Sequence, residues 1–227
     1  MPLQDIVEWD VRNWSAALDF WTRHSVHDLG SCTALELGSR NGGLSLWLAL
    51  EGARVVCSDV LGPTYVAVGK HRAAGVAHRV EYQSIDATKI GYDAAFDIVL
   101  FKSMLGAVGR SGGRAAQATA IAEMHKALKP GGELFFAENL VASPIHRYLR
   151  RRYVRWATTW RYVTVPEMLG LLAPFSSVRY RTIGFAGALG RTSAQRNLLG
   201  SLDRMLLDRL VPKQWRYIMI GVARKGG

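Results

Sequence analysis

Runs of strand-forming residues alternate with segments of helical hydrophobic spacing along most of the chain. The strand-like runs cover residues 33–37, 54–58, 79–84, 95–101 and 133–137. Each run is short, rich in β-branched or other apolar residues, and followed by a turn. Strands that alternate with helices build a parallel sheet with helices on both faces. The pattern therefore predicts an α/β fold for this part of the chain.

The intervening segments show the apolar spacing of helices. Predicted helices cover residues 5–25, 63–75, 111–128, 143–161 and 192–210. A shorter helix is expected to end at Leu172, because Thr164 and Glu167 have the spacing of an N-terminal capping box. Two further strands, at 178–183 and 215–223, are predicted in the C-terminal third. The alternation of strands and helices thus continues to the end of the chain.

A glycine-rich turn connects the first predicted strand to an apolar helix. The turn has the sequence ELGSRNGG, from Glu36 to Gly43, and Gly52 ends the helix. Glycine lets backbone N–H groups approach a ligand with no Cβ in the way, and a helix N-terminus attracts anions. Any tight strand-to-helix turn can use the same residues. The motif therefore indicates a ligand-binding site only together with the residues that end the later strands.

Acidic residues end the second and third predicted strands. Asp59 stands 21 residues after Gly38, and an acid at about this spacing binds ribose hydroxyls in Rossmann-type folds. The same residue could instead cap the next helix. Asp86 follows the third strand, where a loop aspartate can form an Asx turn. Because parallel strands share one carboxyl edge, we expect both acids beside the glycine turn.

Polar residues also end the fourth and fifth predicted strands. Lys102 and Ser103 follow the apolar run 95–101, and Glu138 follows the fifth strand. The turn LKPGG, at residues 128–132, leads into that fifth strand, because proline and two glycines favour a chain reversal. The strand ends therefore carry, in order, a glycine turn, two acids, a lysine–serine pair and a glutamate.

This series of motifs resembles the class I S-adenosylmethionine-dependent methyltransferases. Glu36, Gly38 and Gly42 match the acid and the first and third glycines of that family's first motif, whereas Arg40 replaces the middle glycine. The turn LKPGG is the strongest marker. The resemblance covers about residues 30–140 and extends through the final strands. It implies a Rossmann-like, doubly wound sheet of seven strands, with strands one to six parallel and an antiparallel last strand between strands five and six.

The resemblance implies a single methyltransferase domain over residues 1–227, with an N-terminal helix and helical lid insertions. The expected parts are a cap helix at 5–25, a cofactor-binding core at 30–140, lid or substrate elements at 141–174 and 184–212, and the last strand at 215–223.

The resemblance also implies S-adenosylmethionine as the cofactor and S-adenosylhomocysteine as its product. Glu36 would orient the methionine amino group, Asp59 would bind the ribose hydroxyls and Asp86 would bind the adenine amine. Trp14 is the candidate contact from the N-terminal helix. The expected cofactor-binding residues are Trp14, Glu36, Gly38, Ser39, Arg40, Gly42, Asp59, Val60, Asp86, Ala87 and Lys102.

Position at or near the tips of the fourth and fifth strands nominates the catalytic candidates Lys102, Ser103, Glu138 and His146. A general base is needed only if the methyl acceptor must lose a proton. Lys102 could bind an anionic acceptor, or it could simply be solvated at a strand end. A lysine at this position opposes a divalent metal ion, which prefers oxygen ligands, so we expect no metal.

The predicted helix 143–161 combines an aromatic stripe with arginines. Tyr153, Trp156 and Trp160 share one face with two aliphatic residues, while six arginines and no acid lie in the same segment. The stripe predicts either packing in the core or a wall of the acceptor pocket, near Lys102. The cationic pattern also fits a helix that lies on an anionic membrane.

Composition adds a cationic surface to this picture. The net charge of +11 indicates an anionic partner, which could be a nucleic acid, a membrane surface or an acidic small substrate. The sequence has neither a membrane-spanning apolar run nor the pattern of a secretory signal. Cys32 and Cys57 lack metal or redox spacing and are interpreted as reduced thiols. A cytoplasmic location is expected.

The favoured function is methyl transfer to a small-molecule acceptor, at oxygen or nitrogen, and the acceptor can be anionic. One alternative is a membrane-associated methyltransferase for lipids or glycolipids. Another is an RNA methyltransferase, although the fourth strand ends in FKSM and no appended RNA-binding domain is recognisable. A further alternative is a protein that binds the cofactor without catalysis. The sequence predicts neither the identity of the acceptor nor the oligomeric state.

Overall fold

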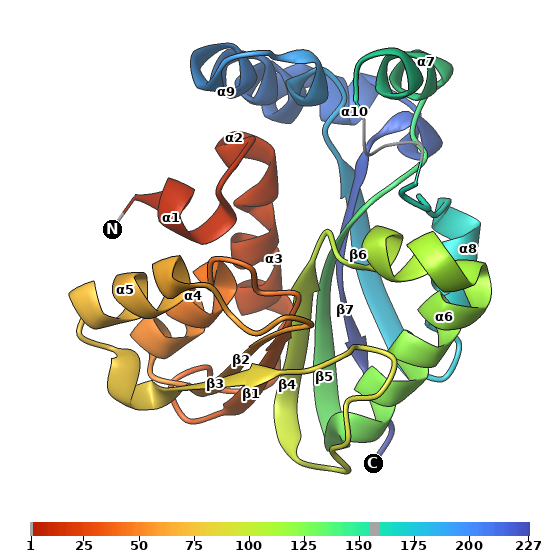
Figure 1. Cartoon of the computed structure of the whole chain (residues 1–227). Coiled ribbons are helices and arrows are strands. Elements are labelled where there is room, and N and C mark those ends of the chain that lie inside the picture. Colours follow the sequence, from red (N-terminus) through yellow and green to blue (C-terminus); the bar gives the residue numbers. More distant parts are fainter. Residues whose placement is uncertain (1, 155–158) are drawn as a thin grey trace.

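A computed structural model describes residues 2–154 and 159–227. Its centre is a seven-stranded sheet in the order β3-β2-β1-β4-β5-β7-β6 (Figure 1). The strands are β1 Thr33–Leu37, β2 Arg54–Asp59, β3 Val80–Ser84, β4 Phe96–Lys102, β5 Leu128–Asn139, β6 Ser177–Ile183 and β7 Ile218–Arg224.

The sheet has the mixed topology that the sequence predicts. β1 pairs in parallel with β2 and β4, and β5 pairs in parallel with β4. β7 lies between β5 and β6 and is antiparallel to both. β4 reads FDIVLFK and is buried over most of its length, as expected for a central strand covered on both faces. The predicted fold class is confirmed.

Helices lie on both faces of this sheet. They are α1 Leu3–Val7, α2 Val11–Trp14, α3 Ala16–His24, α4 Gly43–Glu51, α5 Tyr65–Ala73, α6 Leu105–Ala127, α7 Pro144–Tyr153, α8 Val165–Leu171, α9 Ser193–Leu202 and α10 Asp208–Leu210. A π-helical turn, η4 Asp203–Leu207, joins α9 to α10, and short 3₁₀ turns lie at Ala77–Arg79, Gly187–Leu189 and Lys213–Trp215. The predicted capping box of α8 is present.

The N-terminal segment differs from the prediction of one helix over residues 5–25. It forms three short helices, and the chain turns between them where Glu8 and Asp10 adopt positive φ angles of 68° and 43°. The turn allows α1 to lie on α4, where the carbonyl group of Ile6 fills the space of a Cβ at Gly43. A continuous helix could not make this contact while α3 also packs on the sheet.

Helix α6 begins at Leu105, six residues before the predicted start at 111. The Glu138 carboxylate accepts hydrogen bonds from the backbone N–H groups of Met104, at 2.9 Å, and Leu105, at 2.8 Å. These donors would otherwise lack a partner at the helix N-terminus. The helical path is interrupted at Gly113, whose φ angle is 59°. A contact between residues far apart in sequence therefore sets the start of α6.

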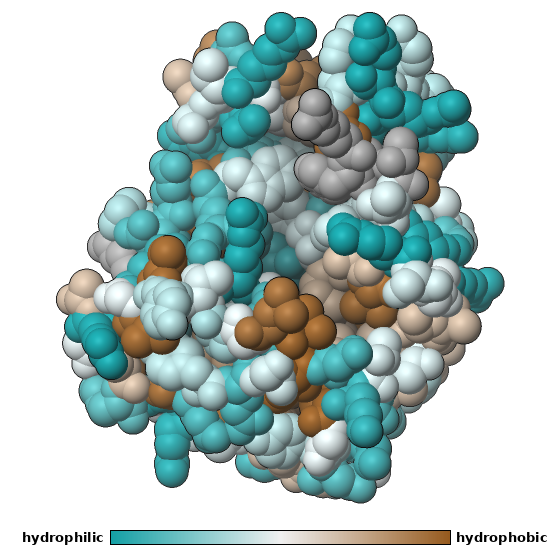
Figure 2. All heavy atoms as spheres, viewed as in Figure 1, coloured by the Kyte–Doolittle hydropathy of each residue, from teal (hydrophilic) through white to brown (hydrophobic). Residues whose placement is uncertain are grey.

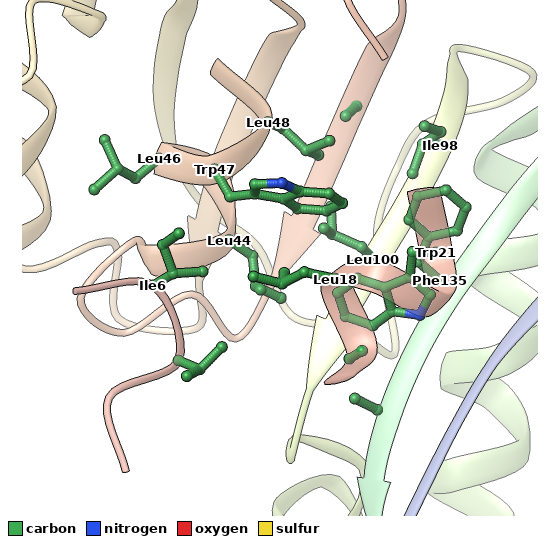
Figure 3. Packing of buried hydrophobic residues seen from close by; sticks show 14 of the residues in the cluster. Ile6, Leu18, Trp21, Leu44, Leu46, Trp47, Leu48, Ile98, Leu100 and Phe135 are labelled. Atoms are coloured by element: carbon green, nitrogen blue, oxygen red, sulfur yellow. The ribbon is translucent and has the colours of Figure 1, made fainter. Parts of the chain in front are cut away.

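Two apolar layers form the core, one on each face of the sheet. On one face, α3 and α4 contribute Trp21 and Trp47, which pack with Phe135 of β5 (Figure 3). The Trp21 indole N–H donates to the Gly221 carbonyl oxygen at 3.0 Å, so this buried polar atom is satisfied. On the other face, α6 and α8 cover the sheet, and Met124 is fully buried there.

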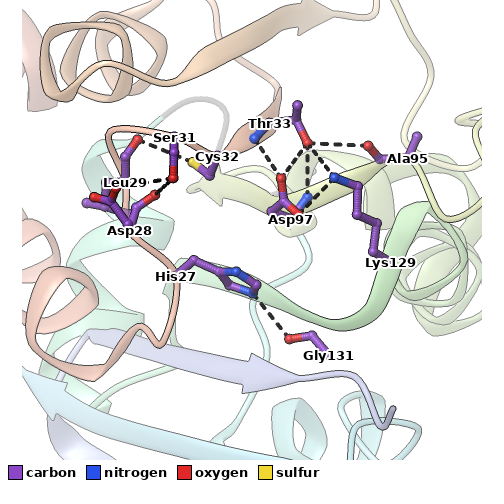
Figure 4. A network of polar contacts seen from close by, with 10 residues as sticks. All are labelled: His27, Asp28, Leu29, Ser31, Cys32, Thr33, Ala95, Asp97, Lys129 and Gly131. Atoms are coloured by element: carbon purple, nitrogen blue, oxygen red, sulfur yellow. Dashed lines mark hydrogen bonds and ion pairs between the residues drawn. The ribbon is translucent and has the colours of Figure 1, made fainter.

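A polar network fixes the amino-terminal edge of the sheet (Figure 4). Asp97 accepts hydrogen bonds from the Thr33 backbone N–H and hydroxyl and from the Lys129 ammonium, at 2.7–2.8 Å. Burial alone would raise the pKa of Asp97, but the hydrogen bonds from Lys129 and Thr33 lower it to about 2. The network ties β1 to β4 and β5 at the edge opposite the strand tips.

Candidate active site

A cavity of about 960 Å³ lies beyond the carboxyl ends of β1, β2 and β4. Figure 2 shows the viewed face hollowed below α7 and α9. The cavity gathers ten of the predicted site residues: Glu36, Gly38, Ser39, Arg40, Asp59, Val60, Asp86, Ala87, Lys102 and Ser103. Convergence of separate strand ends on one hollow is the arrangement in which open α/β sheets bind ligands.

The turn after β1 depends on two glycines with positive φ angles. Gly38 has φ 67°, and a Cβ at this position would lie 2.7 Å from Cγ of Met104. Gly42 has φ 66°, and its Cβ would lie 2.8 Å from both Ala67 Cβ and His71 Cε1. Side chains at these positions would be strained and would collide with their neighbours. The two glycines therefore keep the turn compact against Met104, at the start of α6, and against α5.

His71 supports this turn and is not among the site residues predicted from the sequence. Its Nε2 lies 2.8 Å from the carbonyl oxygen of Gly42, and its Nδ1 lies 2.8 Å from the Tyr82 hydroxyl. Burial lowers the pKa of His71, which favours the neutral ring. A neutral imidazole can donate from one nitrogen and accept at the other, so His71 matches both partners.

Arg40 and Asp59 are linked at the mouth of the turn. The Arg40 backbone N–H donates to the Asp59 carboxylate at 3.0 Å. Arg40 has a φ of 48°, in the region that favours glycine. Its guanidinium Nη1 lies 4.0 Å from the Glu8 carboxylate, and Asn41 donates to the same carboxylate at 2.5 Å. The turn accommodates an arginine where the family motif has glycine, and it directs that side chain toward the N-terminal segment.

Glu36 presents a buried carboxylate at the floor of the cavity. Its Oε2 accepts from the Ser45 backbone N–H at 2.8 Å and from the Ser45 hydroxyl at 2.5 Å. Burial raises the pKa of Glu36 to about 7, although the Ser45 hydrogen bonds and the charge of Lys102 act in the opposite direction. A cationic group in the cavity would therefore have a ready partner.

Lys102 and Ser103 occupy the tip of β4. The Lys102 ammonium lies 5.1 Å from the centre of the Trp14 ring, a cation–π distance. Burial lowers the pKa of Lys102, while the charges of Glu8 and Glu36 act to raise it. Ser103 has a φ of 52°, and its hydroxyl accepts from the Asn139 side chain at 2.5 Å. The two side chains bring a lysine of reduced basicity and an oriented hydroxyl into the cavity wall.

Asp86 forms an Asx turn, one of the two roles that its place in the sequence allows. One of its carboxylate oxygens accepts from both the backbone N–H and the hydroxyl of Thr88, each at 2.8 Å. The residue nevertheless lines the cavity, together with Ala87 and Ile85. The turn and a position at the site are compatible, because each carboxylate oxygen can accept separately.

Four predicted site residues are not part of the cavity lining: Trp14, Gly42, Glu138 and His146. Glu138 is buried and binds the start of α6, and burial raises its pKa to about 7. His146 is buried in α7, with its ring nitrogens 2.7 Å from the Ser143 hydroxyl and 2.8 Å from the Phe185 carbonyl oxygen. Both side chains hold elements that surround the site.

The N-terminal segment reaches the cavity through residues that the prediction did not name. Ile6, Glu8 and Trp9 line the cavity, whereas Trp14 is fully buried and stacks at a tilt on Trp9. The predicted cover over the site is therefore supplied by the turn between α1 and α2. The acidic Glu8 beside Trp9 was a visible signal in the sequence, but a continuous helix would have placed it elsewhere.

The segment after α7 closes another side of the cavity. Trp160 lines it and packs on Gly106, where any Cβ would overlap the indole. Arg161 fixes this position by donating to the side chains of Gln117 and Glu167, both at 2.6 Å. Trp160 thus takes the place predicted for the aromatic wall of the pocket.

The predicted aromatic stripe also includes Tyr153 and Trp156. Tyr153 is 63% exposed and is not among the lining residues. Trp156 lies outside the described residues. Arg150, one of the six arginines of the predicted helix 143–161, donates to the carbonyl oxygens of Leu140, at 2.7 Å, and Val141, at 3.1 Å. This side chain anchors α7 to the end of β5.

Comparisons with known proteins agree with this geometry. A family model described as a methyltransferase domain matches residues 35–136. No curated protein matches the chain. Among residues 2–154 and 159–227, no group of three or more His, Cys, Asp or Glu side chains could hold a metal ion.

Solved structures of low sequence identity share the fold. Phosphoethanolamine N-methyltransferase 2 of Haemonchus contortus, with phosphomonomethylethanolamine and S-adenosylhomocysteine, is 16% identical with a TM-score of 0.65. The match covers 94% of this chain and 53% of that chain, so this chain spans about half the length of that relative.

Two further structures show the range of the fold. The 1,6-didemethyltoxoflavin-N1-methyltransferase of Burkholderia thailandensis is 19% identical, has a TM-score of 0.59, and is matched over 94% of this chain and 77% of that chain. The [4+2]-cyclase SpnF is 20% identical, has a TM-score of 0.62, and is matched over 93% and 80%. At such identities the likeness concerns the fold alone. The matched methyltransferase domain, the seven-stranded sheet and the carboxylates at its strand tips support the identification of the chain as a class I S-adenosylmethionine-dependent methyltransferase.

Proposed function

We propose that the enzyme transfers the methyl group of S-adenosylmethionine to an oxygen or nitrogen atom of a small-molecule acceptor. The main support for this proposal is that one cavity is lined both by Glu36, Asp59 and Asp86 and by Lys102 and Trp160. Its volume of about 960 Å³ lies near the upper end of the roughly 300–1,000 Å³ usual for small-molecule sites. The cavity therefore has room for a cofactor and a small acceptor.

The chemistry of the cavity wall fits the cofactor. S-adenosylmethionine supplies, when bound, a methyl group on a positively charged sulfur. Its amino groups and ribose hydroxyls are hydrogen-bond donors, and Glu36, Asp59 and Asp86 are acceptors. Its carboxylate would be complemented by Arg40 or Lys102, which line the same cavity. We assign Glu36 to the amino group, Asp59 to the ribose and Asp86 to the adenine amine.

Lys102 and Ser103 are the proposed groups at the acceptor. With its pKa lowered by burial, Lys102 is a better proton acceptor near neutral pH than an exposed lysine. It can take the proton that an acceptor hydroxyl or ammonium loses. Ser103, held by Asn139, can orient the acceptor by hydrogen bonding. The site would act chiefly by positioning the two reactants and excluding water.

The solved relatives support a polar, anionic acceptor. The Haemonchus contortus structure holds phosphomonomethylethanolamine, a small molecule with a phosphate group and an amine. A similar anionic group would find Lys102 and Arg110 in the cavity wall of this enzyme. The alternative of an RNA acceptor has the net positive charge and the arginines interleaved with Trp and Tyr in its favour.

A turnover assay tests this function. The enzyme is incubated with S-adenosylmethionine labelled in its methyl group, and label transfer is measured to small amines, phenols and phosphorylated amines. Parallel reactions contain RNA and phospholipid vesicles. We expect transfer of the labelled methyl group to at least one small acceptor. Transfer to RNA or lipid alone, or to none of these at any enzyme concentration, would contradict it.

Arg40→Gly should preserve the fold and weaken the binding of the cofactor. Glycine removes the strain of the left-handed backbone, which stabilises the fold, but it also has more freedom in the unfolded chain, which destabilises the fold. The free energy of unfolding should therefore change by less than about 1 kcal/mol. Loss of a mostly exposed charge should reduce S-adenosylhomocysteine affinity roughly two- to fivefold. Thermal unfolding and calorimetry measure the two effects. An affinity equal to that of the parent would mean that Arg40 has no role in the site.

Cofactor binding should depend on pH through Glu36. Its pKa of about 7 should fall when the cofactor's ammonium group pairs with it. A carboxylate with a raised pKa is ionised only above that pKa, so affinity should increase as pH rises through 7 and then level off. The affinity for S-adenosylhomocysteine should be roughly tenfold lower at pH 6 than at pH 8.

Calorimetric titrations across this pH range measure the dependence, with Glu36→Gln as the test variant. Glu81→Gln, on the exposed side of β3, is the matched control. Glu36→Gln should bind more weakly at pH 8 and show a flat pH profile between 6 and 8. A slope like that of the wild type in Glu36→Gln would assign the dependence to another group.

A further inference from the structure

The stretch from α9 through η4 to α10 carries a row of exposed apolar side chains. Its members are Leu198, Leu202, Met205, Leu206 and Leu210. Leu198, Leu202, Leu206 and Leu210 recur every four residues, and Met205 is three residues after Leu202, so the row lies on one side of the helical stretch. Leu198 is 73% and Met205 is 76% exposed, so this side has no cover within the described chain.

The opposite side of this stretch is polar and buried. Asp203 accepts from the backbone N–H groups of Ala186, at 2.7 Å, and Gly187, at 2.8 Å. Asp208 accepts from the Gly184 N–H at 2.8 Å. The usual surface helix buries its apolar side chains and leaves its acids in water, whereas this stretch buries two acids and exposes leucine and methionine. Its orientation is fixed by these hydrogen bonds, which hold the leucines outward.

Helix α7 is a neighbour at the same end of the molecule. His146 of α7 and Asp203 of η4 bind adjacent residues, Phe185 and Ala186. Figure 1 shows α7, α9 and α10 together beyond the body of the sheet. On the viewed face, Figure 2 shows hydrophobic and hydrophilic side chains intermingled over this end. We name α7 together with residues 193–210 the α7–α10 surface.

The exposed charges of the α7–α10 surface are all positive. Its exposed cations are Arg147, Arg151, Arg152, Arg204 and Arg209. Its acids are Asp203 and Asp208, and both are buried. Both parts of this surface belong wholly to the described residues, so no acidic side chain is exposed on it. The surface thus combines exposed positive charge with exposed leucine and methionine.

We propose that the α7–α10 surface docks on the anionic phospholipid surface of a membrane. A lipid interface offers phosphate groups to the arginines and acyl chains to the apolar side chains. A second copy of the chain would instead bring a like-charged surface into contact, and nucleic acid would leave the leucines in water. Among the described residues, no helix combines the length and the hydropathy of a membrane span.

Vesicle co-sedimentation of the full chain tests this proposal. The probes are vesicles of phosphatidylcholine alone and of phosphatidylcholine mixed with phosphatidylglycerol. The enzyme should sediment with the mixed vesicles and remain in solution with the neutral ones. Raising the salt concentration should release it, because salt screens exposed charges. The readout needs neither cofactor nor acceptor, so it stands apart from the methyl-transfer proposal.

Matched variants separate the two contributions. Leu198→Gln with Met205→Gln removes apolar contact, and Arg147→Gln with Arg151→Gln removes charge. Each pair should lower partition to anionic vesicles by roughly tenfold or more. The control pair, Arg23→Gln with Val26→Gln, changes an exposed arginine and an exposed valine away from this surface and should bind as the wild type. Thermal unfolding checks that every variant is folded.

Three results would overturn the proposal. Equal sedimentation with neutral and anionic vesicles would remove the role of charge. Wild-type partition in both test pairs would place the contact elsewhere. A wild-type dimer in analytical ultracentrifugation that becomes a monomer in Leu198→Gln with Met205→Gln would identify the apolar row as a contact between copies of the chain.

Discussion

Lys102→Met is expected to reduce methyl transfer by roughly 10²-fold or more, the lower end of the effect of a positioned general base. Lys102 is the cavity lysine whose pKa is lowered by burial. Methionine has a similar length and should fill the same space beside Trp14. Single-turnover transfer to the acceptor found in the turnover assay measures the loss. The control variant, Lys89→Met, changes an exposed lysine and should react as the wild type.

A second substitution distinguishes two roles for Lys102. Arginine keeps a positive charge but does not act as a base at neutral pH. If Lys102 accepts a proton, Lys102→Arg should be as slow as Lys102→Met, and the wild-type rate should rise with pH until Lys102 is neutral. If it binds an anionic acceptor, Lys102→Arg should retain most of the rate. Wild-type turnover in Lys102→Met would exclude both roles.

Asp59→Ala should weaken S-adenosylhomocysteine binding by roughly 1.5–3 kcal/mol, or about 10- to 150-fold, as for other hydrogen bonds to a charged group. Asp59 lies in the cavity wall at the end of β2. The fold should tolerate the change. The Arg40 backbone N–H, which donates a hydrogen bond to the Asp59 carboxylate, is exposed and can bind water instead. Thermal unfolding should therefore change little.

Calorimetry with Asp59→Ala and with the control Asp93→Ala measures this effect. Asp93 is exposed and is not among the residues that line the cavity. Asp59→Asn keeps the shape and one acceptor oxygen, and it should fall between the wild type and Asp59→Ala. Unchanged affinity in Asp59→Ala would remove this aspartate from the cofactor site, whatever the fate of the other assignments.

The strand tips could be predicted from the sequence because their position follows from local pattern and from one property of the fold. Parallel strands end at one edge, so Glu36, Asp59 and Lys102 had to be neighbours once their strands were recognised. The resemblance to the family then assigned each of these residues to a part of the expected ligand. The structure brings them into one cavity, although their assigned contacts with a ligand stay predictions.

Features that depend on tertiary contacts could not be predicted in the same way. Helical spacing indicates a helix over 5–25, but packing on α4 breaks it and brings Trp9, not Trp14, to the cavity. Glu138 is a catalytic candidate by its position after β5, and nothing local in the sequence shows that its carboxylate also caps α6. His71 had no signal in the sequence, because its partner Gly42 is brought near only by the fold.

We expect the cavity beyond β1, β2 and β4 to bind S-adenosylmethionine. Isothermal titration of the wild-type protein with S-adenosylhomocysteine, and separately with a nicotinamide dinucleotide, tests it most directly. We expect saturable binding of one S-adenosylhomocysteine per chain and no binding of the dinucleotide, with the affinity reduced in Asp59→Ala. Absence of S-adenosylhomocysteine binding to the folded protein, or preferential binding of the dinucleotide, would contradict the account.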